Sequence, residues 1–243
     1  MIEQDIKVRT RAGQMHAFTA RPTGEGPFPA VIFYMDAPGF RPELEDMARR
    51  IALAGYFCIL PDLYYRMGTI RLDYDRSIPG HATLMMAARN NVTNAMVVED
   101  TAALLLYCDA NPHVLPGPVG CVGHCMSGSF IVSVAAHFPE RIAAAAAFYG
   151  TRIITQEEDS PHLIAGRIKA EMYLSFAEVD SHVGETIADD IGKVFKDVGV
   201  RGVVEKVPGT EHGYCFAERA AYHPVAAEQG WQNLKALFER NLK

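Results

Sequence analysis

One segment of the sequence combines a potential nucleophile with the turn that such a nucleophile requires. Residues 123–128 read Gly-His-Cys-Met-Ser-Gly and follow directly after the apolar run 119–122. A strand that turns abruptly into a helix exposes the residue at the turn, and it needs small residues two positions away on each side. Gly123 and Ser127 meet this requirement around Cys125. The segment matches the elbow pattern G-x-S-x-G, with cysteine for serine and serine for the last glycine.

This position would activate a thiol. It places Cys125 at the N-terminus of a helix, where partial positive charge favours the thiolate. The backbone N–H of Met126 could then donate to an oxyanion during acyl transfer. An inert buried cysteine is the competing interpretation, and it is the better one for Cys58, Cys108 and Cys121. For Cys125 the strand–turn–helix context favours a catalytic role.

A thiol nucleophile needs a base, and the base needs an orienting group. In chains with such an elbow, the acid and then the histidine follow the nucleophile. Asp180 and His212 each come after a predicted strand, and the carboxyl ends of parallel strands meet where such sites assemble. We therefore predict a triad of Cys125, His212 and Asp180. Glu178 and Glu211 are competing carboxylates, which we interpret as solvated loop charges.

Two other histidines lie near these residues in the sequence. His124 belongs to the strand before Cys125, so its ring is badly placed to serve the thiol, and we expect it to be packed. His182 is close to the acid loop and is a candidate for lining the cleft.

The elements that must position these residues alternate between strands and helices. Strands are predicted at 30–34, 56–60, 119–122, 143–149, 172–176 and 203–207, and helices at 43–54, after Thr93, at 130–138 and near the C-terminus. The first 20 residues resemble an antiparallel hairpin. The alternation predicts an α/β fold with a mostly parallel, doubly wound sheet. No linker interrupts it, so residues 1–243 are expected to form a single domain.

Two further predictions concern the helix after Thr93 and residues 64–91. Thr93 is a plausible N-cap, and the helix after it is expected to bury one face. That face comprises Val98, Ala102, Leu105 and Leu106. Residues 64–91 are rich in Gly, Pro, Asp and Arg, and are interpreted as a loop with short helices over an active site.

Composition narrows the class of ligand. The net charge is −6, which disfavours nucleic acid and anionic membrane surfaces and favours a small-molecule ligand. Neither a P-loop nor a dinucleotide fingerprint is present, so no cofactor is expected. Cys121 and Cys125 lack a second ligand pair, so no metal is expected. Five scattered cysteines and an N-terminus without signal-peptide features predict a reduced, cytoplasmic protein, either monomer or dimer.

Taken together, these residues resemble the dienelactone hydrolase family over nearly the whole chain. The matching stretches are 31–39, 55–56, 61–64, the elbow, 148–150, Asp180, 209–213, Tyr222, 226–227 and Trp231. The resemblance implies the α/β-hydrolase fold and a catalytic triad at Cys125, His212 and Asp180. It also implies a second oxyanion donor at Ala37. Asp36 stands where family members carry a glutamate thought to modulate the thiol.

The chain departs from the family pattern at three positions. Ser127 replaces a glycine, and Asp36 is one methylene shorter than the glutamate. Phe216 stands four residues after His212, where the resemblance leads us to expect an arginine that binds a substrate carboxylate. The arginine that follows it, Arg219, is expected to point elsewhere. Three arginines in the irregular segment are possible substitutes: Arg66, Arg71 and Arg76.

The predicted function is hydrolysis of small esters or lactones through a cysteine acyl-enzyme. Phe216 indicates a more apolar substrate pocket and a neutral or aromatic substrate. Thioester or activated-amide cleavage on the same triad is one alternative. The other is a non-enzymatic thiol-sensing or binding protein on the same scaffold, because a fold does not fix a function.

Overall fold

The computed structural model describes residues 1–72 and 78–243, and the chain divides into two compact units, residues 1–117 and 118–243. Arg76 lies outside the described residues. The prediction of a single domain stays a prediction. Among the described residues, no helix combines the length and the apolar composition needed to cross a bilayer.

The first unit contains a hairpin followed by a pair of buried parallel strands. Its elements are β1 (Ile2–Thr10), β2 (Gly13–Arg21), β3 (Ala30–Tyr34), α1 (Pro42–Leu53), β4 (Phe57–Pro61), η1 (Tyr65–Met67), α2 (His81–Asn90) and α3 (Asn94–Ala110). The strand order is β1-β2-β4-β3. β1 and β2 are antiparallel, as the sequence predicts, and β4 runs antiparallel to β2 and parallel to β3. Every residue of β3 and β4 is buried, as expected for strands covered on both faces.

Helix α3 corrects one sequence prediction. Thr93 caps it as expected, with its Oγ1 accepting from the Met96 N–H at 3.2 Å. The buried face is different, because Leu106 is 69% exposed whereas Asp100 and Thr101 are buried. These polar side chains can be buried because they have partners. Arg66 pairs with Asp100 at 2.5 Å, and the Thr101 hydroxyl bonds that of Tyr34 at 2.7 Å. A search for apolar residues at helical spacing does not identify the two polar residues of this face.

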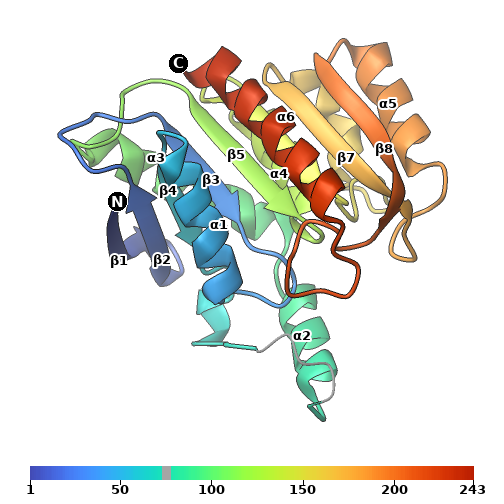
Figure 1. Cartoon of the computed structure of the whole chain (residues 1–243), viewed down its shortest axis with the longest axis horizontal. Coiled ribbons are helices and arrows are strands. Elements are labelled where there is room, and N and C mark those ends of the chain that lie inside the picture. Colours follow the sequence, from blue (N-terminus) through green and yellow to red (C-terminus); the bar gives the residue numbers. More distant parts are fainter. Residues whose placement is uncertain (73–77) are drawn as a thin grey trace. The chain divides into compact units, whose positions relative to one another are not determined.

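The second unit is a parallel α/β structure. Its elements are β5 (Val119–His124), α4 (Ser127–His137), β6 (Ile142–Phe148), η2 (Pro161–Arg167), β7 (Glu171–Val179), α5 (Ile187–Val198), β8 (Gly202–Glu211) and α6 (Pro224–Leu242). The strand order is β5-β6-β7-β8, and each neighbouring pair is parallel. Figure 1 shows α6 across one face of these strands, with α4 on the other. The four strands predicted here are all present, which supports a mostly parallel sheet.

Helix α5 is absent from the sequence prediction. It buries Ala188, Ile191 and Phe195, which lie at the i, i+3 and i+7 spacing of one helix face. Gly199 ends it in the left-handed conformation, with φ 79°. Both signals are readable in the sequence and would have located the helix.

Strand β8 is the exposed end of the second unit. It pairs with β7 alone among the described strands of this unit. Most of its residues are exposed or half-buried, including Val203, Lys206 and Pro208. The chain reaches His212 directly after this strand ends at Glu211.

Candidate active site

The elbow predicted around Cys125 has the backbone geometry of a strained turn. β5 ends at His124, α4 begins at Ser127, and Cys125 between them has φ 54°. A non-glycine residue at positive φ is uncommon and costs free energy, so the surrounding structure must enforce it. The Cys125 carbonyl accepts from the N–H groups of Gly128 at 3.0 Å and Thr151 at 2.8 Å. The Cys125 N–H donates to the Phe148 carbonyl at 3.1 Å.

Glycine is required at two positions of this turn. A Cβ added to Gly123 would lie 2.6 Å from the Cβ of Ser127, which explains the small pair flanking Cys125. A Cβ added to Gly128 would lie 2.3 Å from the Cα of Gly150, so two backbones meet there. The sequence reasoning about small residues at the turn therefore has a direct steric basis.

The histidine and the acid are hydrogen-bonded to each other. The His212 Nδ1 lies 2.7 Å from the Asp180 Oδ2, and the Asp180 side chain is 2% exposed. The second carboxylate oxygen, Oδ1, accepts from the His182 backbone N–H at 2.9 Å. Glu178 and Glu211 are both exposed, and Glu178 accepts instead from the Gly209 N–H at 2.6 Å. The partner of His212 is thus the carboxylate that the sequence reasoning preferred.

The remaining ring nitrogen of His212 is coupled to the thiol. Nε2 is buried and makes no hydrogen bond with the described residues. Burial disfavours the imidazolium, but the hydrogen bond to Asp180 and the interaction with Cys125 outweigh it and raise the pKa of His212 to about 9. At neutral pH the imidazole is therefore protonated. A protonated imidazole can donate a proton to a group that lies beside it.

Rings pack against the His212 imidazole. The Tyr149 ring meets it edge-on at 5.0 Å between centroids, and the His182 ring does so at 4.4 Å. His182 is exposed and Tyr149 is fully buried. His182 thus lies beside the base, as its place near the acid loop suggested. Tyr149 has no role in the sequence reasoning beyond its place in a family stretch.

Phe216 and Arg219 form a buried stack. Phe216 is fully buried and lies 5.0 Å from the ring of His124, which in turn stacks on Phe148 at 5.0 Å. His124 is therefore packed, as predicted. The Arg219 guanidinium lies 4.5 Å from the Phe216 ring centroid, and Arg219 is 7% exposed.

The Arg219 side chain lies beside the segment that carries His212, and the expectation that it points away from a substrate carboxylate stays a prediction. A Cβ on Gly213, the neighbour of His212, would lie 2.8 Å from the Arg219 Cδ and Nη1. The turn after β8 explains this contact, because the Phe216 carbonyl accepts from the Arg219 N–H at 3.1 Å and folds the segment back.

The other cysteines fit the inert interpretation. Cys58, Cys108 and Cys121 are buried free thiols. Cys215 is half-buried as a residue, but its thiol is desolvated. Burial raises the pKa of Cys58, Cys121 and Cys215, so these side chains stay protonated and unreactive at neutral pH.

The turn after β3 in the first unit holds the other two predicted site residues, Asp36 and Ala37. Asp36 is 1% exposed and accepts two hydrogen bonds from Arg41, at 2.5 Å and 3.3 Å. Arg41 also donates to the Gly39 carbonyl at 3.2 Å. The sequence reasoning missed Arg41, because residues 41–42 read as the approach to a helix. The signal was an arginine five residues after a buried aspartate.

The backbone of the same turn presents an unused donor. The Asp36 carbonyl accepts from the Gly39 N–H at 2.9 Å, and the Ala37 carbonyl accepts from the Tyr64 hydroxyl at 2.6 Å. Because the peptide is planar and trans, the Ala37 N–H points opposite to the Asp36 carbonyl. This N–H makes no hydrogen bond within the described part of the chain, although Ala37 is only 6% exposed. Buried backbone N–H groups normally have a partner in the protein or in ordered water, so this N–H is available to an oxyanion.

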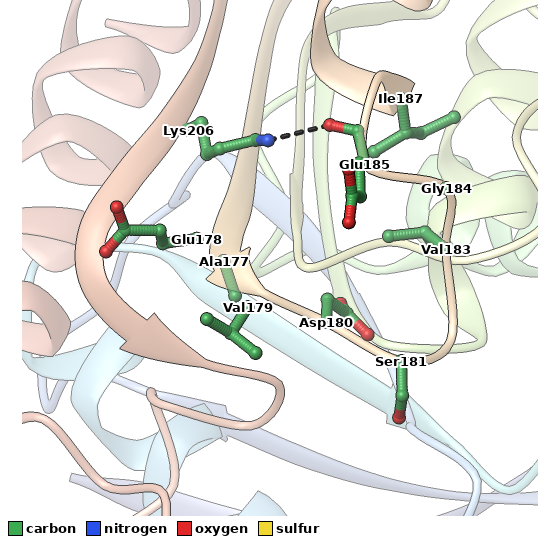
Figure 2. A pocket seen from close by; sticks show the side chains of 10 residues that line it. All are labelled: Ala177, Glu178, Val179, Asp180, Ser181, Val183, Gly184, Glu185, Ile187 and Lys206. Carbon is green, nitrogen blue, oxygen red and sulfur yellow. Dashed lines mark hydrogen bonds between the residues drawn. The ribbon is translucent and has the colours of Figure 1, made fainter.

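A pocket of about 330 Å³ borders the acid loop of the second unit. Figure 2 shows Asp180 and Ser181 on one side of it, with Lys206 and Glu185 across from them. Lys206 donates to the Glu185 carbonyl at 2.7 Å. Neither Cys125 nor His212 is among its described lining residues, so this pocket flanks the acid and does not cover the thiol.

Within residues 1–72 and 78–243, no group of three His, Cys, Asp or Glu side chains is arranged to hold a metal ion.

Known proteins resemble this chain over almost its full length. The family model of the dienelactone hydrolase family matches residues 15–242. A Synechocystis protein with the provisional name carboxymethylenebutenolidase is 27% identical, covering 95% of this chain and 93% of its own. An Escherichia coli protein with the same provisional name is 26% identical, covering 96% of this chain and 85% of its own.

A solved structure extends the likeness to the fold. The crystal structure of a protein from Klebsiella pneumoniae, provisionally named a dienelactone hydrolase, has a TM-score of 0.87 and 25% identity, and covers 98% of both chains. The predicted α/β-hydrolase fold is confirmed by this likeness and by the family match. The chain therefore belongs to the dienelactone hydrolase family, whose members are hydrolases of lactones or esters.

Proposed function

We propose that this protein hydrolyses small esters or lactones through a covalent thioester on Cys125, with His212 as proton carrier and Asp180 as its orienting acid. The observation that carries the proposal is the state of His212. Its Nδ1 is bound to Asp180 at 2.7 Å, and Cys125 helps to raise its pKa to about 9. The positive φ of Cys125 supports the same role, because strain of this kind is concentrated at functional turns.

Acylation begins with the thiolate. The Cys125 Sγ attacks the carbonyl carbon, and the carbonyl oxygen becomes an oxyanion. The N–H groups of Met126 and Ala37 are our proposed donors to that oxyanion, and losing one such donor typically costs about a hundredfold in rate or more. As the tetrahedral species collapses, the C–O bond breaks and His212 gives its proton to the departing alkoxide. In a lactone, that alkoxide remains attached through the acyl chain.

Deacylation needs His212 as a base, and the first step prepares it. Once Cys125 is a neutral thioester, its contribution to the raised pKa of His212 is gone while that of Asp180 remains, and His212 has already given its proton to the leaving group. His212 then takes a proton from water, and the hydroxide adds to the thioester carbonyl. The C–S bond breaks, the acid leaves, and the thiolate and imidazolium are restored. Asp180 holds the tautomer throughout.

The role of Asp36 is proposed as modulation of the thiol, on the strength of the family resemblance. Its partner Arg41 limits what Asp36 can do, because two hydrogen bonds from the guanidinium already occupy the carboxylate oxygens. We also infer a reducing, cytoplasmic setting, which the free cysteines support.

The decisive experiment replaces the nucleophile. Cys125→Ala is expected to remain folded and to lose hydrolysis of p-nitrophenyl acetate, while Cys121→Ala, which alters a buried thiol in the preceding strand β5, retains it. Mass spectrometry of the rapidly quenched native enzyme should show one added acetyl group, absent from Cys125→Ala. Full activity in folded Cys125→Ala would refute the proposal and direct attention to Ser127 or Ser129.

A further inference from the structure

Residues 148–151, which we call the clamp, contact the elbow through backbone groups on both sides of Cys125. The Phe148 carbonyl accepts from the Cys125 N–H at 3.1 Å, and the Thr151 N–H donates to the Cys125 carbonyl at 2.8 Å. Gly150 lies against Gly128 so closely that no Cβ fits between them. The clamp therefore determines where the nucleophile sits.

Within the clamp, the side chain of Tyr149 reaches the base. Its ring lies 5.0 Å from that of His212, in a T-shaped arrangement with 64° between the planes. It also packs on Tyr214 at 5.3 Å and interacts with the thiol of Cys215, both in the loop that carries His212. One short segment thus contacts the nucleophile through its backbone and the base through a side chain.

The backbone of Tyr149 is in a conformation that tyrosine adopts only under constraint. Its φ is 39°, and its N–H donates to the Ser175 carbonyl at 2.5 Å. The Ser175 hydroxyl in turn bonds that of Tyr214 at 2.6 Å. Glycine or asparagine would adopt positive φ more easily. A tyrosine here is expected only if its ring contributes something that the smaller residues cannot.

The contribution that the geometry offers is exclusion of water from the base. Tyr149 is fully buried, and the His212 Nε2 beside it is buried without a hydrogen bond to any described group. If the ring were absent, water could enter, bond Nε2 and compete with the thiol. Asp180 fixes only the Nδ1 side, so a ring packed against the imidazole is also needed to restrict its tilt.

We propose that Tyr149 is a positioning residue, which holds the His212 imidazole in line with Cys125 and keeps its free nitrogen dry. The proposal rests on the function proposed above. It assigns Tyr149 no contact with the substrate, so its loss should act on the chemical step and not on substrate binding.

The test compares two substitutions at Tyr149. Tyr149→Leu removes the ring, and we expect kcat for p-nitrophenyl acetate to fall by about thirtyfold or more while KM changes by less than threefold. Tyr149→Phe keeps the ring and should restore kcat to within threefold of wild type. The matched control is Phe238→Leu, which removes a buried ring of α6 that packs against Gly120 at the start of β5. It should lower Tm without changing kcat.

A spectroscopic readout separates positioning from folding. The Nδ1 proton of His212, bonded to Asp180, should give a far-downfield resonance in proton NMR. It should persist in Tyr149→Phe and Phe238→Leu and broaden through exchange with water in Tyr149→Leu. If Tyr149→Leu does not fold, Tyr149→Gly provides the same test, since glycine tolerates the observed φ.

Two outcomes would overturn the inference. One is a folded Tyr149→Leu with kcat within twofold of wild type and an unchanged His212 resonance. The other is a Tyr149→Phe as impaired as Tyr149→Leu, which would place the function in the hydroxyl. Neither result would restore activity to Cys125→Ala, so failure of this inference is distinct from failure of the proposed function.

Discussion

Two turns of this protein each follow a buried strand, and they are held by different forces. The elbow after β5 is held by backbone hydrogen bonds and by the contact between Gly128 and Gly150. The turn after β3 is held by the buried ion pair of Asp36 and Arg41. The elbow must present a side chain, which requires a strained φ. The turn after β3 presents a backbone N–H, which requires only that its peptide be oriented.

This difference predicts how each turn responds to substitution. Geometry should dominate at the elbow, and charge at the turn after β3. In the second unit, the charge of Asp180 acts on His212 and not on the elbow itself. Substitutions that change only charge or only volume therefore test this difference.

The largest effect is expected where charge acts on the base. Asp180→Asn should lower kcat by about 10⁴-fold, the scale seen when a triad acid becomes an amide. Exposed Glu211→Gln, next to His212, should leave kcat unchanged. A loss below tenfold in Asp180→Asn would mean that another group orients His212.

The same pair predicts a pH dependence. His212 is protonated below its pKa of about 9, so activity should fall as pH rises through about 9. Since Asp180 raises that pKa, NMR titration of His212 in Asp180→Asn should give a lower value. An unchanged pKa of His212 in Asp180→Asn would contradict the role of Asp180 in raising it.

A somewhat smaller effect is expected at the turn after β3. Arg41→Met removes the partner of a buried carboxylate and should lower the free energy of unfolding by about 3 kcal/mol. Arg49→Met is the control, because Arg49 pairs with Glu3 at the surface at 3.0 Å and should cost under about 1 kcal/mol. Urea denaturation measures both. Equal losses would show that the ion pair does not hold this turn.

At the elbow, a larger side chain without any change of charge should be enough to destabilise the protein. Gly128→Ala places a Cβ against the Gly150 backbone and should cost about 2 kcal/mol, with a loss of activity. Gly192→Ala in α5 meets nothing closer than 3.9 Å and should stabilise the protein by up to about 1 kcal/mol. Thermal denaturation of the two variants measures both changes in stability. A neutral Gly128→Ala would mean that the elbow tolerates displacement.

The smallest effect concerns substrate choice. With Phe216 in place of the expected arginine, we predict that a neutral aryl ester is preferred over dienelactone by about tenfold in kcat/KM, or about 1.4 kcal/mol. Arg219 is the alternative partner for a substrate carboxylate, because its side chain lies against Gly213, next to His212. A hundredfold preference for dienelactone that disappears in Arg219→Met would make Arg219 the carboxylate partner.

The sequence was most informative where a pattern has one steric meaning. The spacing of Gly123, Cys125 and Ser127 predicted the elbow, and the structure gives the contact that demands it. Strand Ala30–Tyr34 was predicted to the residue, because an apolar run ends in a turn. The fold class was predicted from the same alternation, and the family match confirms it.

What the sequence did not reveal depends on partners distant along the chain. Asp100 is buried in α3 because Arg66 is available to pair with it, and no local pattern shows this. Arg41 and Tyr149 acquire meaning only through Asp36 and His212. The contact of Arg219 with Phe216 likewise depends on the chain folding back after β8, which no local pattern shows.

Strand β8 has a consequence for how the protein behaves at high concentration. A strand that pairs on one side offers its free N–H and C=O groups to any other strand, which is a route to aggregation. Here Pro208 has no N–H to offer, and the register shifts between Ala177 and Val179 on the neighbouring strand. Lys206 adds a charge that disfavours close approach. The strand that leads to His212 is thus protected against pairing with a strand of another molecule, and Pro208→Val should make the protein more prone to form fibrils.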